Sequence, residues 1–132
     1  MLAEELHPVG CAIALRTIQI IEEENLVAEA SRKGAYLLDA LRARLGTHPH
    51  VGEIRGSGLM CAVEFVKDRS TKAEFLPEER VGARIHAEAQ ARGLFSRIRG
   101  DVFVLALPFI TPDSVLDRIG ETLASSTKAV LG

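Results

Sequence analysis

The sequence has few aromatic residues and no excess of basic ones. Its 132 residues include five Phe, one Tyr and no Trp, which leaves little for stacking against nucleic-acid bases. The 16 basic residues are balanced by 18 acidic ones, and the formal net charge is −2. Binding to a phosphate backbone requires concentrated Lys and Arg, so we expect no nucleic-acid partner.

Cysteine and long apolar segments are also scarce. Cys11 and Cys61 form no CxxC pair, so neither a zinc site nor a disulfide framework is indicated, and both are expected to be buried in a reducing compartment. The stretch from Met1 to Glu5 lacks the basic and apolar regions of a signal peptide. The longest apolar run, Val9 to Ile21, is too short to span a bilayer. We therefore expect a cytoplasmic protein without membrane contact.

Apolar periodicity predicts the secondary structure. Four segments have apolar residues at helical spacing: 8–24, 26–46, 78–92 and 112–130. Two segments contain alternating strands joined by Gly-containing turns and predict hairpins: 51–66 and 94–107. Thr111 and Pro112 are expected to cap and start the last helix. This element order predicts a single α+β domain, with helices packed on a small, mainly antiparallel sheet.

The first predicted helix is apolar on nearly every side between Val9 and Ile21. A helix of this kind is normally buried all round. A chain of this length has little material to cover it, which favours packing against a partner that the sequence does not contain. The alternative is a central core helix. Pro8 suits the first helical position, because the N–H that it lacks has no helical acceptor there.

Three motifs resemble the C-terminal domain of class III aminotransferases, which use pyridoxal phosphate (PLP). They are His7-Pro8-Val9, the stretch from Val51 to Met60, and the stretch from Gly93 to Pro112. The resemblance implies the small domain of PLP fold type I transferases. It also implies a parent reaction that moves an amino group between an amine or ω-amino acid and a keto acid. The large domain that holds the cofactor in the family has no counterpart in this sequence.

The resemblance does not extend to the cofactor site. PLP chemistry needs a lysine for the internal aldimine and an Asp beside the pyridinium nitrogen, and in the family both lie in the large domain. None of Lys33, Lys67, Lys72 and Lys128 matches the Schiff-base motif, and Ala3 to Leu6 stand where the family carries Thr-Tyr-Ser-Gly. We therefore expect no bound PLP, no catalytic residue and no activity for this chain alone, and whether it counts as an enzyme stays open.

Arg97 is the candidate substrate-binding residue. In the pyruvate-linked branch of the family an Arg precedes a Gly-Asp turn by three residues, and Arg97 stands there before Gly100-Asp101. The resemblance implies that its guanidinium grips a substrate carboxylate bidentately and swings aside for an uncharged substrate. Branches acting on acetylornithine, ornithine or 4-aminobutyrate place an Arg three residues after that Asp, where this chain has Val104. The alternative is that Arg97 and Arg99 are solvated strand-edge charges.

The histidines are interpreted as structural. His7 matches the family's Gly-His-Pro motif and is expected to help start the first helix, and His86 is interpreted as a surface or rim residue. His48-Pro49-His50 has the form of a metal-binding pair, but only Glu53 lies at supporting spacing. A solvated turn is therefore favoured, and no metal site is predicted.

Two functions follow from these observations. The first is the C-terminal part of a PLP-dependent class III aminotransferase. The alternative is a non-catalytic remnant that acts as a dimerisation or interaction module, because Glu4 and Glu5 stand where the cofactor phosphate would approach. The expected interactions are self-association, as a homodimer or in another form, and contact with an aminotransferase large domain. Glu64 is a possible partner for Arg55.

Overall fold

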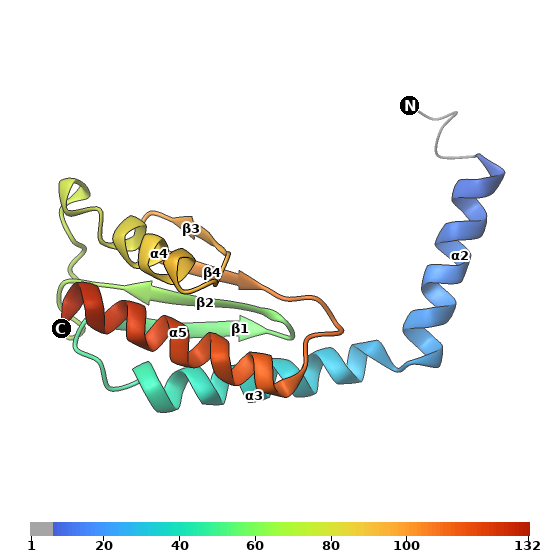
Figure 1. Ribbon diagram of the computed structural model, residues 1–132, viewed down its shortest axis with the longest axis horizontal. Helices are drawn as coiled ribbons and strands as arrows, with labels where there is room; N and C mark the ends of the chain where they lie inside the picture. The colour runs from blue at the N-terminus through green and yellow to red at the C-terminus, as the bar shows by residue number, and fades with distance from the viewer. Residues whose placement is uncertain (1–6) are drawn as a thin grey trace.

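The computed structural model describes residues 7–132 of the chain, so the motif positions Ala3 to Leu6 lie outside the described residues. The helices are α2 (Pro8–Glu23), α3 (Leu26–Leu45), the short 3-10 helix η1 (Pro77–Glu79), α4 (Val81–Ala91) and α5 (Asp113–Leu131). The strands are β1 (Val51–Ser57), β2 (Met60–Phe65), β3 (Arg97–Arg99) and β4 (Val102–Ala106). Figure 1 shows their arrangement.

The strands form one sheet in the order β1-β2-β4-β3, and every neighbouring pair is antiparallel. Helices α3, α4 and α5 pack on one face, where alternate strand residues join the core: Cys61, Val63, Phe65, Phe103 and Leu105. The residues between them point to the opposite face, which no helix within residues 7–132 covers. This arrangement confirms the predicted α+β fold class.

Helix α2 stands apart from the sheet and contacts α3 near its own C-terminal end (Figure 1). It contains no buried residue, so the alternative of a central core helix is wrong. Cys11, which was expected to be buried, is exposed on this helix, whereas Cys61 is buried. The helix begins as predicted: the backbone N–H of Val9 donates to Nδ1 of His7 at 3.3 Å. No helix within residues 7–132 is long and apolar enough to cross a membrane.

The third predicted helix begins later than the sequence suggested. Residues Pro77–Glu79 form the separate 3-10 turn η1. Arg80, with φ of 46°, separates this turn from α4, which starts at Val81. A left-handed residue breaks the helical hydrogen-bond ladder, which apolar spacing does not reveal. The expected helix over 78–92 is therefore shortened at its N-terminal end.

The second hairpin is also shorter than predicted. After α4, the N–H groups of Gly93 and Leu94 still donate to the carbonyls of Gln90 and Ala89, each at 2.9 Å. These bonds close the helix end and keep the chain out of the sheet until Arg97. The expected hairpin over 94–107 thus has strands only at 97–99 and 102–106.

The start of α5 differs from the expectation by one residue. Pro112 is the N-cap and Asp113 the first helical residue. Thr111 does not cap the helix, because its hydroxyl donates to the carbonyl of Pro108 at 2.8 Å. The predicted roles of Thr111 and Pro112 are therefore wrong in detail, although the helix is present.

Helix α3 lies very close to the turn between β1 and β2. At Gly34 a Cβ atom would overlap the carbonyl of Gly58 and lie 2.7 Å from its Cα. Gly58 itself has φ of 53°, in the left-handed region that favours glycine. The two glycines let the helix and the turn meet backbone to backbone.

Candidate functional site

Arg97 lies on the uncovered face of the sheet. It is exposed and pairs directly with Val104 across β3 and β4. Val104 in turn pairs with Ala62 on β2, and Ala62 pairs with Arg55 on β1. Because cross-strand partners share a face, this row contains no carboxylate between Arg97 and the far edge of the sheet.

The neighbouring row of cross-strand partners, by contrast, contains carboxylates. Arg99 pairs with Val102, which pairs with Glu64 on β2, and Glu64 pairs with Glu53 on β1. The Arg55 guanidinium donates to both carboxylates, at 2.8 Å to Glu53 and 3.0 Å to Glu64. The predicted Arg55–Glu64 pair is thus confirmed. Arg99 therefore faces a row that carries two carboxylates, whereas Arg97 does not.

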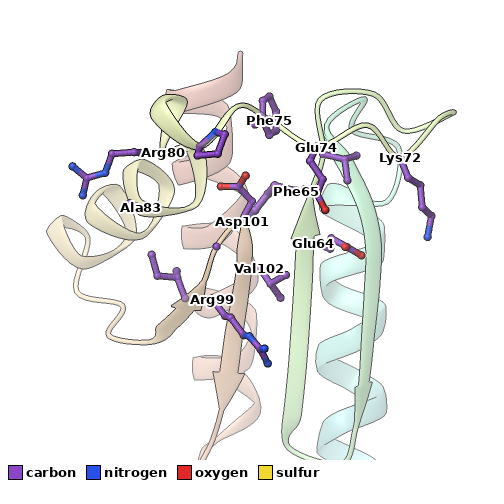
Figure 2. Close-up of a pocket in the computed structure, with 14 residues that line it drawn as sticks. Glu64, Phe65, Lys72, Glu74, Phe75, Arg80, Ala83, Arg99, Asp101 and Val102 are labelled. Carbon is purple, nitrogen blue, oxygen red and sulfur yellow. The ribbon is translucent and has the colours of Figure 1, made fainter.

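A cavity of about 570 Å³ opens at the end of the sheet beside Arg99. It lies between the end of β2, the loop that leads to η1, the start of α4 and the β3–β4 turn, and Arg97 is not among its lining residues. Figure 2 shows the Asp101 carboxylate turned toward the start of α4, with Lys72 and Arg80 directed away from the cavity. Acidic and basic groups are mixed there, so the cavity has no marked preference for a ligand of one charge.

Arg97 and Arg99 thus differ in surroundings even though they share a face. Neither forms an ion pair within residues 7–132. Arg99 lines the same cavity as Glu64 and Asp101 and lies in a row with Glu64 and Glu53. Arg97 has no such carboxylate in its row, so its guanidinium is the more available to an anion from outside.

Helix α4 is tied to the hairpin that carries Arg97. The backbone N–H of Gly82 donates to Oδ1 of Asp101 at 2.7 Å. Nε2 of His86 lies 3.1 Å from the carbonyl oxygen of Ser96, the residue before Arg97. His86 is also half-buried against Phe103, with ring centroids 5.9 Å apart. His86 is thus partly exposed, as expected of a rim residue, but it also bonds to the Ser96 backbone, a partner that helical spacing does not reveal.

His48 and His50 stabilise the turn in which they lie. The N–H of His50 donates to Nδ1 of His48 at 3.2 Å, and Nδ1 of His50 donates to the carbonyl of Lys67 at 3.0 Å. Burial, followed by the neighbouring His50, lowers the pKa of His48. Within residues 7–132 no group of three or more His, Cys, Asp or Glu side chains is placed to hold a metal ion.

The lysines do not fit a PLP site. An internal aldimine requires an amine held in a sheltered pocket and directed at the cofactor. Nζ of Lys33 donates to the carbonyl of Phe109 at 2.6 Å, and the other three lysines are exposed: Lys67, Lys72 and Lys128. The residues described here therefore do not provide the Schiff-base position.

The sequence profile of Aminotransferase class-III matches residues 7–126. The chain belongs to the class III aminotransferases. Membership implies PLP as the cofactor of the parent enzyme. An uncharacterized aminotransferase from Sinorhizobium fredii is 40% identical over 94% of this chain and 26% of its own length. A gamma aminobutyrate transaminase from Solanum lycopersicum is 37% identical over 94% of this chain and 25% of its own length.

Solved transaminase structures share the fold. An (S)-enantioselective omega-transaminase from Thermomicrobium roseum has a TM-score of 0.87 at 40% identity, covering 96% of this chain and 28% of that one. An omega-transaminase from Pseudomonas jessenii has a TM-score of 0.85 at 38% identity over 94% of this chain and 27% of that one. This class III aminotransferase chain thus spans about a quarter of the length of the relatives that it matches.

Proposed function

We propose that this chain supplies the small-domain part of a PLP-dependent aminotransferase, in which Arg97 binds the carboxylate of a keto acid or amino acid substrate. The observation that carries the proposal is the position of Arg97. It is exposed, lies on the uncovered sheet face in an Arg-x-x-Gly-Asp motif, and has no ion-pair partner within residues 7–132. The parent reaction moves an amino group between an amine or ω-amino acid and a keto acid.

Arg97 contributes binding and selection. Its planar guanidinium donates two parallel hydrogen bonds to a carboxylate, which fixes the direction of the substrate as well as its distance. Because no carboxylate within residues 7–132 forms an ion pair with Arg97, the side chain can turn away when an uncharged amine is bound. The proton-transfer chemistry belongs to PLP and to residues outside this segment, so no chemical step is assigned to Arg97.

The chain alone is proposed to be inactive and to bind no PLP as an aldimine. The exposed or otherwise bonded lysines support this proposal. The chain mixed with PLP is expected to give no saturable visible band that borohydride traps on one lysine, as judged by mass spectrometry. We further propose a cytoplasmic location, which the free thiols of Cys11 and Cys61 support.

A chimera tests the role of Arg97. Residues 7–132 replace the matching segment of the Thermomicrobium roseum omega-transaminase, and Arg97→Ala is compared with the matched variant Arg99→Ala. Loss of a bidentate carboxylate contact should cost about 2–3 kcal/mol, or roughly 30- to 150-fold in kcat/KM for pyruvate. An uncharged aldehyde acceptor should change much less. A carboxylate-selective loss in Arg99→Ala, with none in Arg97→Ala, would contradict the assignment.

Helix α2 favours a second candidate function, that of a dimerisation or interaction module. Four large apolar side chains on it are more than half exposed: Val9, Ile13, Leu15 and Ile18. Such a surface is typical of a protein interface rather than of a solvated helix. Self-association through α2 is compatible with either function, because it needs no bound cofactor.

A further inference from the structure

We infer that His86 and Asp101 are positioning residues that anchor β3, the strand of Arg97, to helix α4. His86 lies on α4, and Asp101 lies in the β3–β4 turn and accepts a hydrogen bond from α4. The inference rests on the proposed carboxylate-binding role of Arg97. It adds two residues that do not themselves bind the carboxylate but fix the position of the strand that carries Arg97. The two bonds bracket β3: one holds the residue before it, and the other holds the turn after it.

Strand β3 needs external support. It contains only three residues, Arg97–Arg99, and it is an outer strand, paired with β4 on one side alone. Short outer strands open readily, because few hydrogen bonds close them. A carboxylate held by two parallel hydrogen bonds tolerates little displacement of the guanidinium, so motion of this backbone would weaken binding.

Asp101 fixes the turn end. Arg80, the N-cap of α4, makes no side-chain capping bond, and Asp101 accepts from the Gly82 N–H at 2.7 Å in its place. The contact is close: a Cβ on Gly82 would overlap the Gly100 carbonyl and lie 2.9 Å from the Cα of Asp101. The carbonyl of Asp101 also accepts from the N–H of Phe65 at 2.9 Å. The turn is thereby held to both α4 and the central strand β2.

His86 fixes the other end. A carbonyl oxygen only accepts, so Nε2 of His86 must carry the proton that it shares with Ser96. The ring packs against Phe103, the strand neighbour of Ile98, which limits its rotation. Because the bond is to the Ser96 backbone, the serine side chain takes no part. Its buried hydroxyl has no hydrogen-bond partner within residues 7–132.

Amide hydrogen exchange in the complete 132-residue chain tests the inference without any substrate. His86→Phe keeps a ring against Phe103 but removes the donor, and Asp101→Ala removes the acceptor. Each should speed exchange of the β3 and β4 amides about five- to tenfold, the effect of losing roughly one hydrogen bond. Asp101→Asn keeps an acceptor oxygen and should largely restore protection.

Two controls show that the effect is local. Ser96→Ala leaves the carbonyl bond in place, and Glu88→Gln breaks only the ion pair that Glu88 forms with Arg92 on α4. Neither should change exchange in β3, and the β1–β2 amides should stay protected in every variant, which verifies folding. Unchanged β3 exchange in both His86→Phe and Asp101→Ala would overturn the inference.

The chimera separates this inference from the proposed function. His86→Phe and Asp101→Ala should raise KM for pyruvate about five- to tenfold, with kcat and the kinetics of an uncharged aldehyde little changed, and Glu88→Gln should change neither. If Arg97→Ala itself shows no carboxylate-selective loss, the proposed function fails. If Arg97→Ala shows that loss but His86→Phe and Asp101→Ala do not, the positioning role fails alone.

Discussion

Arg97 on β3 and Val104 on β4 are direct cross-strand partners on the uncovered face of the sheet. Side chains paired in this way have Cβ atoms about 4.5–5.5 Å apart. The two positions at which branches of the class III family carry an arginine therefore occupy one place in the fold. A guanidinium that starts from either strand can reach the same space above the sheet.

Exchanging the two residues should therefore preserve part of the carboxylate binding. In the chimera, Arg97→Val should lower kcat/KM for pyruvate roughly 30- to 150-fold. Adding Val104→Arg to this variant should restore a substantial part of the lost kcat/KM. Steady-state kinetics with pyruvate and with an uncharged aldehyde measure the recovery. A double variant no better than Arg97→Val would mean that the two positions are not interchangeable.

Helix α2 should drive self-association. Burying roughly 300 Å² of apolar surface at about 25 cal/mol per Å² contributes about 7.5 kcal/mol before the costs of association are subtracted. Ile13→Glu should shift the chain toward monomer in analytical ultracentrifugation. Gln19→Glu adds the same charge to another side of the same helix and should shift it much less. A clean monomer for the unmodified chain at high concentration would rule this interface out.

Gly34→Ala should destabilise the domain, because the new Cβ would collide with the Gly58 backbone. Overpacking of this kind typically costs about 1–3 kcal/mol. Gly10→Ala is the matched control, since nothing lies within 4 Å of a Cβ there. It should raise the helicity of α2 and leave the unfolding of the rest nearly unchanged. Urea denaturation of both variants, followed by circular dichroism, decides between these outcomes.

Arg32 should make stability depend on pH below about 4. Its guanidinium donates to Asp113 at 3.0 Å and to Glu29 at 3.1 Å, and these bonds lower the pKa of both carboxyls. A carboxyl with a lowered folded pKa stabilises the fold above its unfolded pKa, near 4, and that contribution disappears as the pH falls through the folded value.

Arg32→Gln tests this dependence. The pKa of Asp113, followed by NMR of its carboxyl carbon, should rise toward its ordinary value. The stability difference from the unmodified chain should shrink as the pH falls. Arg42→Gln is the control, because Arg42 pairs with Asp39 on the same helix and should leave Asp113 unaffected. An unchanged pKa of Asp113 in Arg32→Gln would show that the bond is not maintained in solution.

The fold class could be predicted because apolar spacing is a local property. Three of the apolar residues that recur at helical spacing in α3 are buried, Leu37, Leu41 and Leu45, whereas Val27 of the same pattern is exposed. Boundaries were less predictable where tertiary contacts decide them. The start of α4 depends on Asp101, which lies 19 positions away in sequence from its partner Gly82. No pattern within residues 78–92 contains that information.

The position of the candidate site was predictable to a similar extent. The motif predicted Arg97 as the substrate-binding residue, and that role stays a prediction; strand alternation places Arg97 and Arg99 on one face and cannot distinguish them. The distinction became visible through the register, which aligns Arg99 with Glu64 and Arg97 with Ala62 by way of β4. Cross-strand register depends on turn geometry and bulges, so a single strand sequence does not specify it.

Strand β3 has a consequence for solubility. Its outer edge exposes backbone groups that a second chain could pair with, which is the usual route to edge-to-edge aggregation. An antiparallel meeting of two such edges would place Arg97 and Arg99 of one copy against the same arginines of the other. Like charges opposed across a strand pair repel. Arg97, which is proposed to receive a substrate anion, and its neighbour Arg99 therefore also oppose growth of the sheet into a fibre.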